Sequence, residues 1–199
     1  MSSINTTAWA GHGGQGWTGV VLAGGRSSRM GEDKALIELA GRSLLDRALD
    51  ILQPHVNDLL VIGDPAKYGH VGPFVMPDDV PGIGPLGGIN TALHYALHDR
   101  VIVLAVDMPN VNAALIERLK QGLLPEMDAF VPVCDGAIEP LIAAYQRRCR
   151  PTFEACIAQG LWKVSDALDK VRTTYTQICP GENGWPKDLF RNLNEPSDL

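Results

Sequence analysis

The segment at residues 22–34 (LAGGRSSRMGEDK) combines cations and glycines in a way that suits phosphate binding. Glycines let backbone N–H groups turn toward an anion, Arg binds phosphate through paired hydrogen bonds, and Lys acts as a point charge. A solvated glycine-rich turn is the alternative. The pattern is not a Walker A loop, because five residues separate its last two glycines and Ala follows the Lys. The residues concerned are Gly24, Gly25, Arg26, Arg29, Gly31 and Lys34.

A second glycine-rich loop covers residues 77–89 (PDDVPGIGPLGGI). Its glycines again let the backbone approach a ligand closely, and its prolines limit the entropy lost on ordering the loop. At its start, the carboxylate of Asp78 or Asp79 could accept hydrogen bonds from a sugar hydroxyl or a base amino group. The pattern favours a ligand-binding loop, with a long structural connection as the alternative.

Asp107 directly follows the apolar run VIVLAV at residues 101–106. Such a run is typical of a central parallel strand that is buried on both faces. A carboxylate at the carboxyl end of that strand would face the same sheet edge as the first loop. Mg²⁺ is usually bound by one or two carboxylates plus substrate phosphates, so Asp107 is a candidate magnesium ligand. An Asp that caps the turn into the next helix is the alternative.

The elements that carry these loops alternate between strand and helix over the first two-thirds of the chain. This alternation predicts an α/β fold whose mostly parallel central sheet has helices on both faces. We expect strands over residues 19–23, 59–62, 74–76, 101–106, 129–133, 141–145 and 173–178. We expect helices over residues 44–52, 88–98, 113–123 and 151–159, and a short one capped by Ser165.

Composition excludes several classes of protein. The chain has 199 residues, 45% of them hydrophobic and 20% charged, which indicates one globular domain. The net charge of −6 argues against generic binding to nucleic acid or acidic lipid, and no apolar run approaches the roughly 18 residues of a membrane span. The four cysteines lack CxxC spacing. We expect a cytoplasmic protein with reduced thiols, because no secretory signal pattern is present.

Residues 1–18 are polar and glycine-rich, and we expect a flexible extension there, before a single domain over residues 19–199. The extension contains a literal GxGxxG at residues 11–16, but the dinucleotide fingerprint needs a strand before it and a helix after it. His94 and His98 are spaced i, i+4 on an expected helix. Without a third ligand, a half-exposed helix face is favoured there over a metal site.

Together these segments resemble the molybdenum cofactor guanylyltransferases, a branch of the nucleotidyltransferases with a Rossmann-like α/β fold. The resemblance runs from about residue 19 to the end, and the GPLGG loop favours guanylyl over cytidylyl transfer. The chain departs from the family pattern at Gly63 and Asp64, where an Asn is usual, and in NLNEP, where a Thr commonly precedes the Pro. The matching segments are residues 22–34, 77–89, 106–109 (VDMP), 139–145 (EPLIAAY) and 192–199 (NLNEPSDL).

The resemblance implies roles for individual residues. Lys34, Arg29 and Asp107 would carry catalysis, with Lys34 on the nucleotide phosphates and Asp107 on Mg²⁺. Arg29, Asn192 and Asn194 would lie toward the pterin. The implied nucleotide-binding residues are Leu22, Ala23, Gly24, Gly25, Lys34, Asp78, Gly84, Pro85, Leu86, Gly87 and Asp107.

The implied reaction transfers GMP from GTP to the terminal phosphate of molybdopterin and releases pyrophosphate. The attacking phosphate oxygen is already ionised, so no catalytic triad is needed. GTP and molybdopterin would be the partners, with transient contacts to cofactor-synthesis proteins and molybdoenzyme chaperones. Three rivals stay open: a cytidylyltransferase that uses CTP, a catalytically inactive nucleotide-binding adaptor, and a dinucleotide-dependent oxidoreductase.

Overall fold

The structure is a computed structural model that describes residues 14–24 and 33–193. Its strands are β1 (Gly14–Leu22), β2 (Glu38–Leu39), β3 (Arg42–Ser43), β4 (Asp58–Ile62), β5 (Phe74–Met76), β6 (His98–Ala105), β7 (Ala129–Cys134), β8 (Ala137–Ile138), β9 (Ile142–Gln146) and β10 (Thr173–Gln177). Its α-helices are α1 (Leu44–Leu52), α2 (Pro65–Tyr68), α3 (Pro85–Tyr95), α4 (Ala113–Gly122), α5 (Arg150–Ala158) and α6 (Val164–Leu168).

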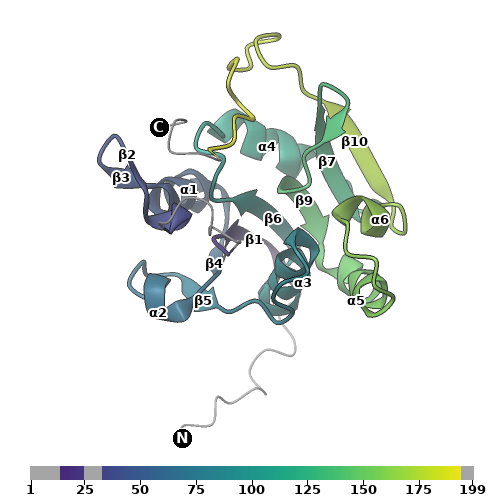
Figure 1. Cartoon of the computed structure of the whole chain (residues 1–199). Coiled ribbons are helices and arrows are strands. Elements are labelled where there is room, and N and C mark those ends of the chain that lie inside the picture. The colour runs from purple at the N-terminus through teal and green to yellow at the C-terminus, as the bar shows by residue number, and fades with distance from the viewer. Residues whose placement is uncertain (1–13, 25–32, 194–199) are drawn as a thin grey trace, which may run out of the picture.

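Eight strands form one sheet in the order β10–β7–β9–β6–β1–β4–β5, with β8 paired to β7 (Figure 1). β6, β1, β4 and β5 run parallel to one another, and β10 runs parallel to β7. β9 lies antiparallel between β6 and β7. The predicted α/β fold with a mostly parallel central sheet is confirmed.

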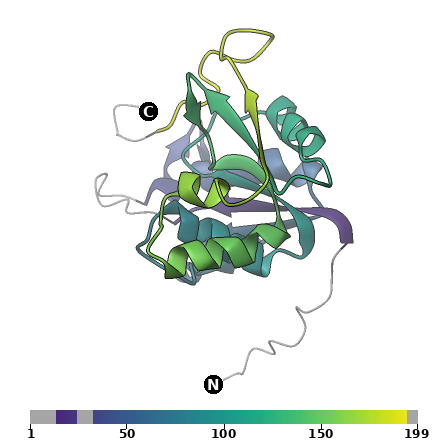
Figure 2. The same cartoon turned by 90° about the vertical axis from the view of Figure 1, so that its right-hand side faces the viewer.

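Helices cover both faces of this sheet, as Figure 2 shows. The buried side chains of α1 and α4 belong to the core on one face, and those of α3, α5 and α6 to the core on the other. β6 supplies both cores, because Val101 and Val103 point to one side while Ile102 and Leu104 point to the other. The apolar run is therefore a strand buried on both faces, as predicted.

The first strand is longer than predicted. β1 begins at Gly14 rather than Gly19, so residues 14–18 belong to the sheet and not to a flexible extension. Trp17 explains the difference, because it is only 6% exposed and the Arg100 guanidinium lies 4.9 Å from its ring centroid. The part of the GxGxxG segment within the described residues is thus strand.

The third helix is shifted from its predicted position. α3 spans Pro85–Tyr95 instead of residues 88–98, because Pro favours the first position of a helix. His98 opens β6, where its backbone N–H donates to Thr18 Oγ1 at 3.1 Å. The i, i+4 helical pair of His94 and His98 does not exist.

Other expected helices and strands are present with small shifts at their ends. α6 begins at Val164, before its predicted cap Ser165. As predicted, Ser43 caps α1, with its Oγ accepting from the Asp46 N–H at 3.0 Å. Within the described ranges, no helix has the length and apolar character to cross a membrane.

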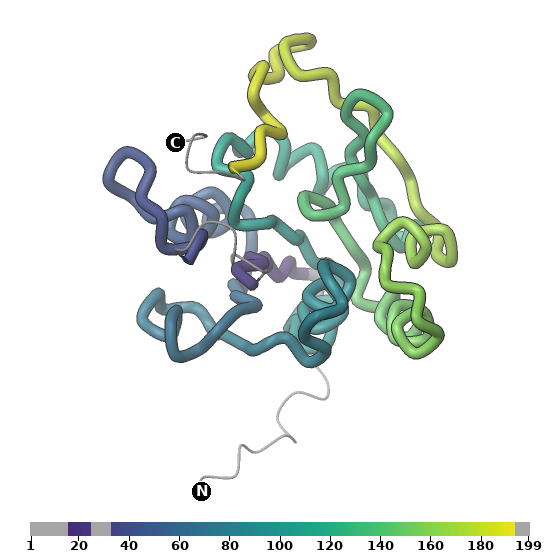
Figure 3. The backbone as a smooth tube through the Cα atoms, viewed as in Figure 1, coloured from purple at the N-terminus to yellow at the C-terminus, as the bar shows by residue number. Residues whose placement is uncertain are grey.

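The C-terminal segment returns to the middle of the sheet. After β10 the chain passes over the top of Figure 3 and comes back beside the segment that follows β6. There the Leu193 N–H donates to the Asp107 carbonyl at 3.0 Å, and Asn110 Nδ2 donates to the Asp188 carbonyl at 3.1 Å. The end of the chain is thereby fixed next to a predicted site residue.

Candidate active site

Lys34 and Asp107 meet at the carboxyl edge of the sheet. Lys34 opens a short 3₁₀ turn after the first glycine-rich loop, and Asp107 follows β6. The Lys34 Nζ atom lies 3.3 Å from Asp107 Oδ2, and the two side chains are 18% and 26% exposed. Two residues that were predicted from separate motifs thus form a partly shielded ion pair.

Backbone hydrogen bonds between strand ends bring these two residues together. The Ile62 carbonyl at the end of β4 accepts from the N–H groups of Ala23 and Gly24, at 2.9 and 3.1 Å. The Leu22 carbonyl accepts from the Val106 N–H at 3.2 Å. Since the Ala23 and Gly24 amides donate within the protein, they do not turn toward an anion. Gly25, Arg26, Arg29 and Gly31 lie outside the described residues.

Asp33 anchors the turn that carries Lys34. Its Oδ1 accepts from the Ala35 N–H at 3.2 Å and from the Tyr68 hydroxyl at 2.6 Å, and its Oδ2 lies 2.7 Å from Lys67 Nζ. Burial alone would raise the pKa of the Asp33 carboxyl, but the Lys67 and Tyr68 donors hold that pKa below its usual value. Asp33 is therefore a charged anchor. The sequence analysis missed it, although an Asp directly before a turn is a recognisable capping signal.

Tyr68 also explains the departure from the family pattern at Gly63. A Cβ atom at position 63 would lie 2.7 Å from the Tyr68 ring, which leaves no space for a side chain. Burial and the Asp33 carboxylate raise the pKa of the Tyr68 hydroxyl, so it stays protonated and donates. The Tyr68 ring that packs against Gly63 carries the hydroxyl that supports Asp33.

The second glycine-rich loop folds back onto the first turn of α3. Asp78 Oδ1 accepts from the Val80 N–H at 2.9 Å and from the Thr91 hydroxyl at 3.0 Å. A Cβ atom at Gly87 would lie 2.7 Å from the Val80 carbonyl oxygen and 3.1 Å from Asp78 Oδ2. Gly84 precedes the helix with a φ of +88°, a conformation that favours glycine. The glycines thus allow direct loop–helix contact.

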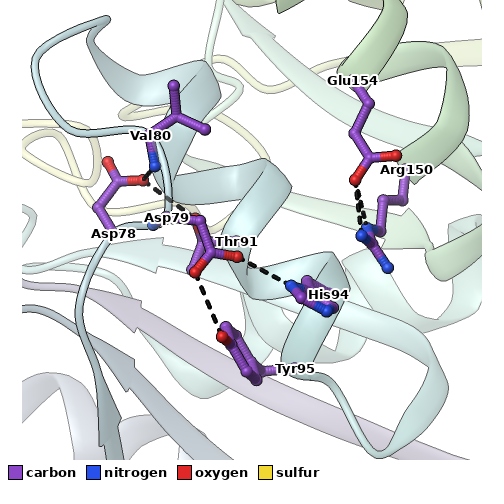
Figure 4. Close-up of polar contacts among 8 residues, drawn as sticks. All are labelled: Asp78, Asp79, Val80, Thr91, His94, Tyr95, Arg150 and Glu154. Atoms are coloured by element: carbon purple, nitrogen blue, oxygen red, sulfur yellow. Dashed lines mark hydrogen bonds and ion pairs between the residues drawn. The ribbon is translucent and has the colours of Figure 1, made fainter. Parts of the chain in front are cut away.

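The adjacent carboxylates of Asp78 and Asp79 have different surroundings, as Figure 4 shows. Asp79 Oδ2 lies 2.8 Å from His94 Nδ1, and Asp79 Oδ1 accepts from the Tyr95 hydroxyl at 3.2 Å. Both Asp79 oxygens are therefore engaged along α3. Asp78 instead lies over Gly87, near the N-terminus of that helix.

A pocket of about 170 Å³ lies beside Asp107. Asp107, Asn192 and Pro85 all line it, so the pterin-side and nucleotide-side predictions converge there. Asn194 lies outside the described residues. Glu139 lines the same pocket, and burial raises the pKa of its carboxyl. The sequence analysis noted its motif but did not assign it a role.

A larger hollow, of about 560 Å³, lies at the opposite edge of the sheet. Asp50 of α1, Asn57 before β4 and Phe74 of β5 are among its lining residues. None of the predicted site residues that the structure describes lines it.

Comparison with known proteins identifies the family. Residues 19–171 match the MobA-like NTP transferase domain. The chain belongs to this family. It is 32% identical to a probable molybdenum cofactor guanylyltransferase of Carboxydothermus hydrogenoformans, over 92% of this chain and 93% of that protein. It is 33% identical to the molybdenum cofactor guanylyltransferase of Vibrio cholerae, over 90% and 88%.

A solved structure agrees with these relatives. The molybdopterin-guanine dinucleotide biosynthesis protein A of Archaeoglobus fulgidus superposes with a TM-score of 0.76 at 28% identity, covering 91% of this chain and 94% of that one. The nucleotidyltransferase fold and family expected from the sequence are confirmed. A MobA-like enzyme is a transferase, which removes the oxidoreductase rival.

The donor set of this MobA-like site fits a hard divalent cation. No three His, Cys, Asp or Glu side chains of residues 14–24 and 33–193 cluster as a metal site. Asp107 supplies a carboxylate, and Asn192 lines the same pocket and can supply an amide oxygen. Mg²⁺ commonly binds one or two carboxylates and takes its remaining ligands from water and substrate phosphates. The residues therefore suit an ion that arrives with a nucleotide.

We predict that Gly87→Ala destabilises the MobA-like domain by about 1–3 kcal/mol, because the new methyl group would press on the Val80 carbonyl. Gly88→Ala is the matched control, since its Cβ would lie 3.4 Å from Leu22 Cδ2 in ordinary contact. The control should be neutral or gain up to about 1 kcal/mol of helix propensity. Urea unfolding measures both variants, and equal midpoints would contradict the loop–helix contact.

Proposed function

We propose that the chain transfers GMP from GTP to the terminal phosphate of molybdopterin, which forms the guanine dinucleotide form of the molybdenum cofactor and releases pyrophosphate. The observation that carries this proposal is the Lys34–Asp107 pair at 3.3 Å. It joins, at one point of a MobA-like domain, the cation that we assign to phosphate binding and the carboxylate that we assign to the metal. The names of the Carboxydothermus and Vibrio relatives support the guanylyl donor.

The reaction needs alignment and charge neutralisation rather than a protein nucleophile. A terminal phosphate oxygen of molybdopterin forms a bond to the α-phosphorus of GTP, and the bond from that phosphorus to the bridging oxygen of pyrophosphate breaks. Lys34 stabilises the negative charge on the phosphates. Asp107 would hold Mg²⁺, which supplies further neutralisation when bound. The Asp33–Tyr68 contact keeps the Lys34 turn in place.

The two substrates occupy opposite sides of the Lys34–Asp107 pair in this proposal. Asp78 and the α3 N-terminus face the nucleotide, with Gly84, Pro85, Leu86 and Gly87 forming the floor of its site. Asn192 faces the pterin, and we assign Arg29 and Asn194 to the same side. We further propose a cytoplasmic location and transient contacts with the proteins that supply the pterin and receive the product.

Nucleotide choice is the decisive test of this proposal. The purified chain is given molybdopterin, Mg²⁺ and either GTP or CTP, and pyrophosphate release is measured. We expect kcat/KM for GTP to exceed that for CTP by at least tenfold. Faster turnover with CTP would make the chain a cytidylyltransferase, and GTP binding without pyrophosphate release would make it a binding module.

Replacing Lys34 tests the electrostatic part of the mechanism. We expect Lys34→Ala to lower kcat by on the order of 10²–10³, the usual effect of one oriented charge contact. Lys120→Ala is a matched control, because Lys120 is 23% exposed and pairs with Glu117 Oε1 at 3.2 Å on α4. Initial rates with saturating GTP measure both variants. Near-normal turnover of Lys34→Ala would remove Lys34 from the reaction.

Asp107→Asn tests the proposed metal ligand. The amide is a weaker ligand than the carboxylate, so the Mg²⁺ concentration for half-maximal rate should rise about tenfold or more. The fold should persist, since the Leu193 N–H bonds the backbone carbonyl of residue 107 rather than its side chain. Rates measured across a Mg²⁺ titration, with circular dichroism as the folding control, decide the matter. An unchanged Mg²⁺ dependence would count against Asp107.

A further inference from the structure

We propose that Thr91 is a positioning residue for the nucleotide: its hydroxyl fixes Asp78 so that Asp78 Oδ2 remains the acceptor offered to the nucleoside. The inference rests on the proposed function, because it assumes that a nucleoside occupies the second glycine-rich loop. Thr91 lies in α3 and is fully buried. A buried hydroxyl without partners would be costly, so its contacts define its role.

Both hydrogen-bonding capacities of Thr91 are directed at the loop. Its hydroxyl donates to Asp78 Oδ1 at 3.0 Å and accepts from the Asp79 N–H at 3.0 Å. One side chain therefore fixes the carboxylate orientation of Asp78 and the backbone of the next residue. The sequence could not show this, because a Thr within a helix gives no sign of which loop folds onto it.

These contacts occupy one oxygen of the Asp78 carboxylate and leave the other as an acceptor. Oδ1 already accepts from the Thr91 hydroxyl and the Val80 N–H. Within the part of the chain that the structure describes, Oδ2 accepts no hydrogen bond. It lies above the Gly87 backbone, because a Cβ atom added at Gly87 would be 3.1 Å from it. A carboxylate oxygen in this position suits a ligand that donates a hydrogen bond, such as a ribose hydroxyl or a base N–H.

The C-terminal part of α3 holds the same loop at a second residue, Asp79. Thr91, His94 and Tyr95 are spaced i, i+3 and i+4, so they share one face of the helix. His94 and Tyr95 engage both oxygens of Asp79, as Figure 4 shows. Burial, with the Asp79 carboxylate nearby, raises the pKa of the Tyr95 hydroxyl and keeps it a donor. A loop held at two adjacent residues loses less entropy when a ligand binds.

The test compares three variants of the full chain. Thr91→Val removes the hydroxyl and keeps the shape, while Thr91→Ser keeps the hydroxyl. Thr18→Val is the matched control, because Thr18 is also fully buried and its hydroxyl accepts from the His98 N–H at the other end of the sheet. GTP affinity is measured by calorimetry with Mg²⁺ present, KM for each substrate by pyrophosphate release, and stability by thermal unfolding.

We expect Thr91→Val to raise the Kd and KM for GTP roughly tenfold or more, which is the usual effect of losing a hydrogen bond to a charged group. The KM for molybdopterin should not change. Thr91→Ser should stay within about threefold of the wild type, and Thr18→Val should bind GTP normally even where its melting temperature falls as far as that of Thr91→Val. Unchanged GTP affinity in Thr91→Val, or equal weakening in Thr18→Val, overturns the inference.

A double-mutant cycle separates this inference from the proposed function. Once Asp78→Asn has removed the carboxylate, adding Thr91→Val should raise the GTP Kd by less than about threefold. A full tenfold further rise would show that Thr91 acts independently of Asp78 and would overturn the inference. If the wild type binds GTP with this coupling but releases no pyrophosphate, guanylyl transfer fails and the positioning role stands.

Discussion

The site depends on hydrogen bonds that join the carboxyl ends of three parallel strands. The Ile62 carbonyl of β4 accepts from two amides after β1, and the Leu22 carbonyl of β1 accepts from the amide that precedes Asp107. These bonds hold the start of the loop after β1 directly beside the start of the loop after β6. Asp107 comes directly after Val106, and the contacts of Asp33 with Tyr68 and Lys67 hold the turn that brings Lys34 to it.

The Lys34–Asp107 pair gives an acidic protein a way to receive polyanions. When the proposed substrates bind, Lys34 would leave the Asp107 carboxylate and contact phosphate oxygens. Asp107 would leave the Lys34 ammonium group and contact a divalent cation. Each charge keeps a partner of opposite sign, so neither is left buried and alone, which is the costly case. Both side chains are largely shielded from solvent, at 18% and 26% exposure, which strengthens the contacts they form.

The sequence predicted the parts of this arrangement that local pattern controls. The apolar run before Asp107 and the glycine-rich loops are contiguous signals, and they correctly placed Lys34 and Asp107 at one sheet edge. Contacts between distant segments were not predictable. The early start of β1 depends on Arg100 covering Trp17, and the roles of Asp33 and Thr91 depend on Tyr68 and Asp78 reaching them through the folded chain.

The hydrogen bond from the Leu193 amide to the Asp107 carbonyl ties the last described residue to the centre of the sheet. Asn192, on the proposed acceptor side, therefore lies in a segment that a main-chain hydrogen bond holds next to Asp107, the proposed metal ligand. In the proposed reaction, this main-chain contact would help to set the distance between the attacking oxygen and the phosphorus. The acceptor would then meet a spacing that the fold holds before either substrate binds.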